Sequence, residues 1–154
     1  MLRATMTSPG VIRFDDVPVP VPAPDQVLLR VRRIGVCGSD IHVWHGRHPY
    51  TSYPVVQGHE FSAEVAETAA GLAAGTLVTA PPQITCGECL SCRRGDYHIC
   101  ERLKVMGFQA PGVAQEFVAL PRSAIMPLPE DFTPELGALV EPLAVAVHAL
   151  GRAE

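Results

Sequence analysis

Residues 86–100 read CGECLSCRRGDYHIC and hold four of the five cysteines of this 154-residue chain. The C-x2-C-x2-C-x7-C spacing crowds four thiols into a segment that also contains Gly87 and Gly95, as expected of a loop. At two-residue gaps, thiolates can converge tetrahedrally on one ion while backbone amides turn in to hydrogen-bond the sulfurs. The sequence therefore predicts a zinc-binding lobe with the ligands Cys86, Cys89, Cys92 and Cys100.

Two other uses of four cysteines have to be weighed against zinc. In the bacterial ferredoxin run the last gap is three residues and a proline follows, whereas here the gap is seven and Glu101 follows. Unliganded or redox-active thiols are the remaining alternative. Zinc fits the spacing best. A closed four-thiolate site has no open coordination position, so its expected role is structural.

Composition indicates a single folded domain over residues 1–154. Hydrophobic residues make up 47% of the chain and charged residues only 18%, which argues against disorder. Fifteen prolines and 13 glycines favour a mainly β body with short helices. The formal net charge of -4 and the lack of a basic run argue against nucleic acid or an anionic membrane as a partner. Neither a signal peptide nor a membrane-spanning segment is visible, so we expect a cytoplasmic protein.

Alternation of apolar and polar residues predicts several short strands. Val27, Leu29 and Val31 fall on one face of a strand that ends at Gly35, with Arg30 and Arg32 on the other. Further strands are expected near Ile12 and Arg13 and at 61–66, 77–80 and 116–120, with an edge piece at 125–128.

Two helical segments are also expected. Ser39 or Asp40 is a candidate cap for a short helix that reaches Trp44. Near the end of the chain, Thr133 caps a helical pattern that begins at Pro134, is restarted by Pro142 and runs to Leu150.

A second group of metal-capable residues lies outside the cysteine-rich segment. Cys37 follows the strand that ends at Gly35, His59 and Glu60 precede another strand, and Glu141 lies at the helix restart. A catalytic zinc takes three protein ligands of mixed sulfur, nitrogen and oxygen character and keeps one position open. Cys37, His59 and a carboxylate supply such a set. His45, His48, His98 and His148 are expected to be exposed or structural.

Four stretches, in this order, resemble the zinc-dependent medium-chain alcohol and polyol dehydrogenases, especially their sorbitol and threonine dehydrogenase-like branch. They are GVCGSDIH at 35–42, GHE at 58–60, the cysteine segment at 86–100 and EPLAVAVH at 141–148. Their joint occurrence is far more specific than any one of them. The resemblance implies a GroES-like, partly open β-barrel with a four-cysteine zinc lobe and a C-terminal helix.

The resemblance also implies a role for each site residue. Cys37 and His59 would bind a catalytic zinc with Glu60 as a further ligand, giving two zinc ions per chain. Glu141 would touch that metal directly or through water, and which carboxylate binds is left open. Asp40 would orient His59 through its other ring nitrogen. Ser39 would contact the zinc-bound alcohol, and His42 would pass its proton on to solvent.

The family binds NAD or NADP on a Rossmann domain, and this chain contains no G-x-G-x-x-G. We expect residues 134–154 to begin the connection to that absent domain. The expected function is oxidation of a secondary alcohol by hydride transfer to a nicotinamide held elsewhere, with the chain inactive alone. The expected partners are a small alcohol or polyol, a separate Rossmann domain and, at full length, further copies in a homo-oligomer.

The alternative is a stand-alone, non-enzymatic zinc-binding module or an inactive remnant of the family. Retention of the candidate catalytic residues weighs against it, because a module without catalytic demand need not keep them. These residues are Cys37, Ser39, His42, His59 and Glu60.

Overall fold

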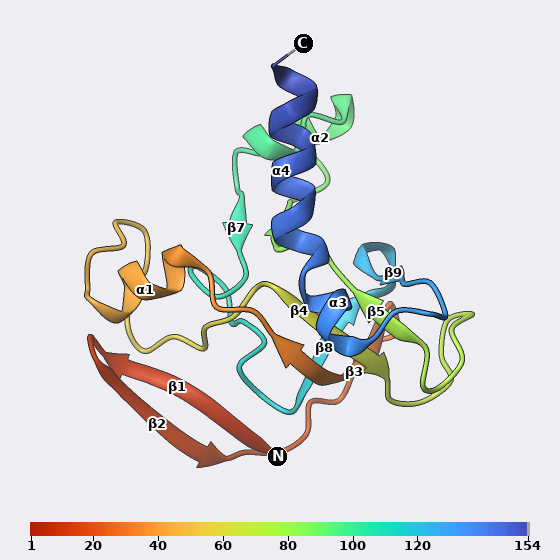
Figure 1. The fold of residues 1–154 in the computed structure, drawn as a ribbon, viewed down its shortest axis with the longest axis horizontal. Helices are drawn as coiled ribbons and strands as arrows, with labels where there is room; N and C mark the ends of the chain where they lie inside the picture. The colour runs from red at the N-terminus through yellow and green to blue at the C-terminus, as the bar shows by residue number, and fades with distance from the viewer. Residues whose placement is uncertain (154) are drawn as a thin grey trace.

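The computed structural model describes residues 1–153 and is built around a five-stranded antiparallel sheet (Figure 1). The strand order is β8-β3-β4-β5-β9. The bounds are β3 (Gln26–Ile34), β4 (Phe61–Val65), β5 (Leu77–Thr79), β8 (Phe117–Pro121) and β9 (Met126–Pro127). These strands confirm the mainly β prediction. β9 pairs with β5 at the edge of the sheet, where Pro127, which has no N–H to donate, is tolerated.

The central strand β3 shows why this sequence forms a sheet. Val27 and Leu29 are fully buried, whereas Arg30 and Arg32 are exposed, as the alternation predicts. Leu29 pairs with Val65 of β4 on one side and with Val118 of β8 on the other. Full burial of each such aliphatic side chain contributes about 1.5–3 kcal/mol. The register of β3 is therefore set by its apolar face.

A hairpin of β1 (Leu2–Ser8) and β2 (Val11–Asp16) lies beside this sheet. The sequence predicts only the second of these strands, near Ile12. β1 was missed because most of its residues are small or polar, and it is defined by pairing with β2 rather than by a regular apolar face. Its Met6 is buried in a second hydrophobic cluster with Val43, Val55 and Phe108.

The first helix is capped by another residue than the sequence predicts. Helix α1 (Gly38–Trp44) has Cys37 at its N-cap position, in place of Ser39 or Asp40. The Asp40 side chain instead accepts a hydrogen bond from the Cys37 N–H at 3.0 Å. In a capping box this is the bond from the N-cap backbone to the side chain three residues later.

Helices α3 (Pro134–Ala138) and α4 (Val140–Arg152) meet at Leu139. Thr133 caps α3 as predicted, because its Oγ1 accepts the Leu136 N–H at 3.3 Å. α4 starts two residues before Pro142. A proline in the first turn costs little, since the first N–H groups of a helix have no partner within the helix.

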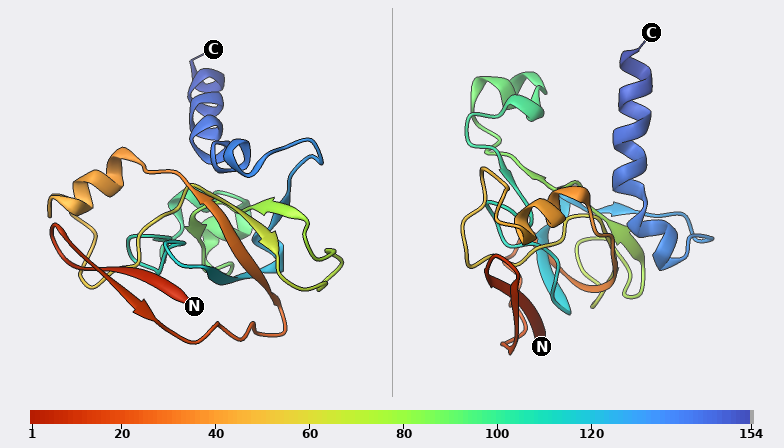
Figure 2. Two further views of the ribbon diagram at one scale, coloured as in Figure 1. Left: turned by 60° about the horizontal axis from the view of Figure 1, so that its bottom comes forward. Right: turned by 60° about the vertical axis from the view of Figure 1, so that its left-hand side comes forward.

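The cysteine lobe contains α2 (Leu90–Arg94) and the 3-10 turn η1 (Tyr97–Ile99). Two short strands that the sequence analysis did not predict, β6 (Gln83–Ile84) and β7 (Lys104–Val105), pair at its base. A second 3-10 turn, η2 (Arg122–Ala124), leads from β8 to β9. The right-hand view of Figure 2 shows the lobe and α4 projecting from the same side of the barrel. The cysteine lobe and α4 thus stand on the same side of the sheet.

No helix within residues 1–153 is long and apolar enough to cross a membrane. α4 nevertheless exposes large apolar side chains. They are Leu143, Val145, Val147 and Leu150, and Leu139 is exposed at the start of the helix.

Candidate metal centres

The four cysteine sulfurs of the lobe converge on one point. All four Sγ atoms lie within 4.8 Å of one another. Cys86 Sγ lies 3.9 Å from Cys92 Sγ and 3.6 Å from Cys100 Sγ. With zinc–sulfur bonds of about 2.3 Å, a tetrahedral site places its sulfurs about 3.8 Å apart. The cluster thus has the dimensions of a four-thiolate zinc site.

Backbone hydrogen bonds and burial shift the pKa values of these thiols in opposite directions. The N–H groups of Cys86, Cys89 and Cys92 each donate to a cysteine sulfur at 3.4 Å. The amide of Cys89 is the largest cause that lowers the pKa of Cys86, to about 6. Burial raises the pKa of Cys92 to about 12, and the neighbouring thiols add to that rise. Four thiolates in one place would repel one another, and a zinc ion held by these cysteines would supply the compensating positive charge.

The second centre forms where β3 ends and β4 begins. These strands are antiparallel neighbours with Ile34 opposite Phe61, so Cys37 comes close to His59 and Glu60. One ligand atom from each of these three side chains lies within 4.8 Å of the others. His59 and Glu60 are buried, 5% and 8% exposed. A thiol, an imidazole and a carboxylate in this arrangement fit a zinc ion with one position left open.

Asp40 lies between two of these ligands. Its Oδ2 accepts the Cys37 N–H, and its Oδ1 lies 3.8 Å from His59 Nδ1. The His59 Nδ1 is buried and makes no hydrogen bond within the described structure. A buried ring nitrogen normally has a partner, and a carboxylate facing the imidazole is the usual neighbour of a metal-binding histidine. This leaves Nε2 as the ring nitrogen available to a metal.

A loop from a distant part of the chain packs against the His59 turn. The Gly112 N–H donates to Val56 O at 2.7 Å, and the Val113 N–H donates to Gly58 O at 3.0 Å. The Phe108 ring lies 5.0 Å from the His59 ring. This contact could not be predicted from the sequence, because nothing local to residues 108–113 indicates which turn they contact.

Of the remaining predicted site residues, Ser39 and His42 follow Cys37 on α1, and Glu141 lies at the start of α4. Ser39 is half-buried and His42 exposed, three residues apart on α1, so both lie on one face of the helix. Glu141, in the first turn of α4, is not one of the three clustered ligands. Burial raises the pKa of Glu141; the charge of His59 lowers it and that of Glu60 raises it. Glu60 is therefore the carboxylate within the cluster, and Glu141 is the second one nearby.

A groove of about 640 Å³ opens beside Glu141. Ala144 and His148 line it from α4, Gln83 from β6, and His98 from the cysteine lobe. The groove lies between the lobe and α4, and of the predicted carboxylates Glu141 lines it while Glu60 does not.

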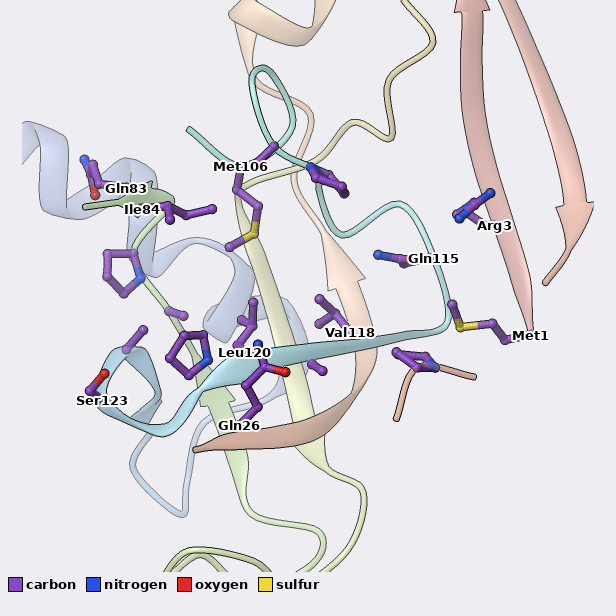
Figure 3. A pocket seen from close by; sticks show the side chains of 18 of the residues that line it. Met1, Arg3, Gln26, Gln83, Ile84, Met106, Gln115, Val118, Leu120 and Ser123 are labelled. Carbon is purple, nitrogen blue, oxygen red and sulfur yellow. The ribbon is translucent and has the colours of Figure 1, made fainter. Parts of the chain in front are cut away.

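A cavity of about 860 Å³ lies at another part of the barrel (Figure 3). Its lining includes Met1, Arg3, Gln26, Met106 and Leu120. Among the lining residues that the structure describes there is no cysteine, histidine or acid. It therefore offers no metal ligand or general base, and the centre at Cys37 is the better candidate for chemistry.

Comparison with known proteins agrees with this geometry. Residues 23–130 match the alcohol dehydrogenase GroES-like domain. The chain is 36% identical to L-threonine 3-dehydrogenase of Rhizobium etli over 156 residues, 96% of this chain and 45% of that protein. It is 35% identical to L-galactonate-5-dehydrogenase of Escherichia coli over 138 residues, 88% of this chain and 40% of that protein.

A solved structure shows the same fold. The structure of an alcohol dehydrogenase from Escherichia coli CFT073, complexed with NADH, superposes with a TM-score of 0.88 at 28% identity. The match covers 99% of this chain and 45% of that one, so the chain spans less than half the length of these relatives. The chain belongs to the alcohol dehydrogenase GroES-like domain family of zinc-dependent medium-chain dehydrogenases.

Proposed function

We propose that this chain is the zinc-binding catalytic part of an NAD(P)-dependent dehydrogenase that oxidises a secondary alcohol of a small polyol or hydroxy acid. The convergence of Cys37, His59 and Glu60 at the mouth of the sheet carries the proposal. The names of the two relatives point to oxidation at carbon 3 of L-threonine and carbon 5 of L-galactonate, both secondary alcohols.

Each side chain then has a task. Cys37, His59 and Glu60 hold the metal, and Asp40 orients the His59 ring. A zinc ion bound there supplies a Lewis acid that lowers the pKa of the substrate hydroxyl. Ser39 would accept the hydroxyl proton while giving up its own, and the exposed His42 on the same helix face would pass that proton on to solvent. The carboxylate of Glu141 lines the groove between the lobe and α4.

The nicotinamide would be held by a further domain. Residues 1–154 contain no glycine-rich dinucleotide fingerprint, and the NADH complex with the same fold is more than twice as long. The exposed apolar residues of α4 suit packing against such a domain. All five cysteines are free thiols, which suits the cytoplasm.

Zinc stoichiometry and a chimera together test the proposal. The wild-type chain should bind two zinc ions and Cys37→Ser one. When the chain is fused after residue 152 to the remainder of the R. etli L-threonine 3-dehydrogenase, the wild-type fusion should reduce NAD or NADP with an alcohol, and the Cys37→Ser fusion should not. A saturated wild-type chain that holds only the four-cysteine zinc would contradict the proposal.

A further inference from the structure

We propose that Gln57 is a positioning residue for the second zinc centre. It fixes the Asp40 carboxylate between Cys37 and His59, so that both ligands keep the geometry that binds the metal. This inference rests on the proposed function, because it concerns the same Cys37–His59–Glu60 site.

The contacts of Gln57 converge on one residue. Its Nε2 donates to the Asp40 carbonyl oxygen at 3.2 Å and to Asp40 Oδ1 at 3.2 Å. A side-chain amide has two N–H donors, so Asp40 uses both of them. The other carboxylate oxygen, Oδ2, accepts the Cys37 N–H at 3.0 Å. The Asp40 carboxylate is therefore held at both oxygens and cannot rotate without breaking one of these bonds.

The position of Gln57 in the chain makes this bond a link between two ligand-bearing segments. Asp40 lies three residues after Cys37, and Gln57 lies two residues before His59. The Gln57–Asp40 bond thus joins the start of α1 to the turn that carries His59 and Glu60. It adds to the hydrogen bond from the Gly35 N–H to Glu60 O at 2.7 Å, which joins the same two stretches two residues before Cys37.

The bond also sets the partner of the His59 ring. Oδ1 is the oxygen that faces His59 Nδ1, at 3.8 Å, and a carboxylate oxygen can accept from Gln57 and His59 together. Holding Oδ1 on this side keeps an acceptor for the otherwise unpaired Nδ1–H. An acceptor there fixes the tautomer that leaves Nε2 free for the metal.

Gln57→Leu tests the proposal because leucine is of similar size and cannot form hydrogen bonds. Gln26→Leu is the matched control: Gln26 is also half-buried and its side-chain amide also bonds to the backbone, with Oε1 accepting the Ala23 N–H at 3.1 Å, away from Asp40 and the His59 turn. Zinc retention is measured on the whole chain against graded chelator, and the four-cysteine zinc serves as an internal reference.

We expect Gln57→Leu to lower the affinity of the second zinc about 10-fold or more, within the range seen when the partner of a ligand is lost. The four-cysteine zinc should stay unchanged, and Gln26→Leu should match the wild type. Co²⁺ bound at the second centre should show an altered visible absorption spectrum in Gln57→Leu only. Gln57→Glu keeps a polar side chain but places a carboxylate against Asp40, so it should weaken zinc binding at the second centre further. It is the substitute variant if Gln57→Leu folds poorly.

A double-mutant cycle separates positioning from packing. In an Asp40→Ala background, Gln57→Leu should have no further effect on zinc affinity, because Gln57 acts through Asp40. An undiminished effect in that background, or an unchanged second-site affinity in Gln57→Leu, would overturn the proposal and leave the proposed function intact. A wild-type chain without a second zinc would overturn both.

Discussion

Gly35 lies directly against the Glu60 side chain. A Cβ at position 35 would stand 2.9 Å from Glu60 Cβ and would overlap its carboxylate. The Gly35 N–H also donates to Glu60 O at 2.7 Å, so the backbone cannot move away freely. The absence of a side chain here allows Glu60 to lie beside Cys37.

Gly35→Ala should therefore displace Glu60. We expect a loss of about 1–3 kcal/mol in the free energy of unfolding from overpacking, and weaker binding of the second zinc with the four-cysteine zinc retained. Urea unfolding and zinc stoichiometry measure the two effects. Gly151→Ala is the control, because its Cβ meets nothing within 4 Å and alanine favours the helix. Normal second-site binding in Gly35→Ala would show that Glu60 does not need this space.

At this scale the sequence predicts the metal ligands but not the residues that fit around them. Cys37, His59 and Glu60 follow from their chemistry and from the family resemblance. Gly35 and Gln57 do not, because their roles depend on an approach between β3 and β4 that exists only in the folded sheet. The choice of Glu60 over Glu141 as the clustered carboxylate also required the fold.

The cysteine lobe is an element with little core of its own. Its buried residues are mainly the cysteines, and β6 and β7 contribute only two residues each. Cys92→Ser should release the structural zinc, lower Tm and open residues 86–103 to proteolysis, since the metal supplies much of the folding free energy of such a lobe. Cys37→Ser should empty the second site and leave Tm nearly unchanged. Calorimetry and limited proteolysis measure the difference, and an equal loss of Tm in both variants would contradict the division of roles.

The start of α3 gives a pH-dependent prediction. The helix N-terminal amide of Glu135, the Thr133 hydroxyl and Arg33 lower the pKa of the Glu135 carboxyl, which lies 2.8 Å from the Arg33 Nε. A lowered pKa in the folded state stabilises the fold above the ordinary glutamate pKa, and this contribution disappears as pH falls through the lowered value. Glu135→Gln should remove this part of the acid sensitivity of Tm. The effect on Tm is small because the Glu135–Arg33 pair is exposed. Identical profiles of Tm against pH for the wild type and Glu135→Gln would refute the prediction.

The strands differ in how well the sequence predicts them, for a physical reason. In β3 apolar and polar residues alternate because one face is buried, whereas β4 and β8 are short, largely apolar runs; both patterns are local. β1, β6 and β7 are defined by partners elsewhere in the chain, and β6 and β7 are too short to show a period. The start of α4 was misplaced because Pro142 is compatible with any position in a first turn.

At the scale of the whole molecule, α4 exposes an apolar surface. Leu143 and Val147, one turn apart, are 63% and 60% exposed. Replacing both with glutamine should leave the Tm of the chain nearly unchanged, since neither is buried, while reducing its self-association and weakening the activity of the chimera. Sedimentation and NAD(P)H formation measure these effects. Leu90→Gln, on the exposed surface of α2, is the control, and equal changes in that variant would show a general solubility effect.

Cys37 occupies two positions at once, as the N-cap of α1 and as a predicted ligand of the second centre. This coincidence imposes an order of assembly. The thiol reaches its place when α1 has started and β3 has paired with β4, so an unfolded chain has no prebuilt site there. The four cysteines of the lobe, by contrast, lie within fifteen residues and can gather a metal locally. The lobe should load early during synthesis, whereas the second centre should accept its metal only as the last step of folding.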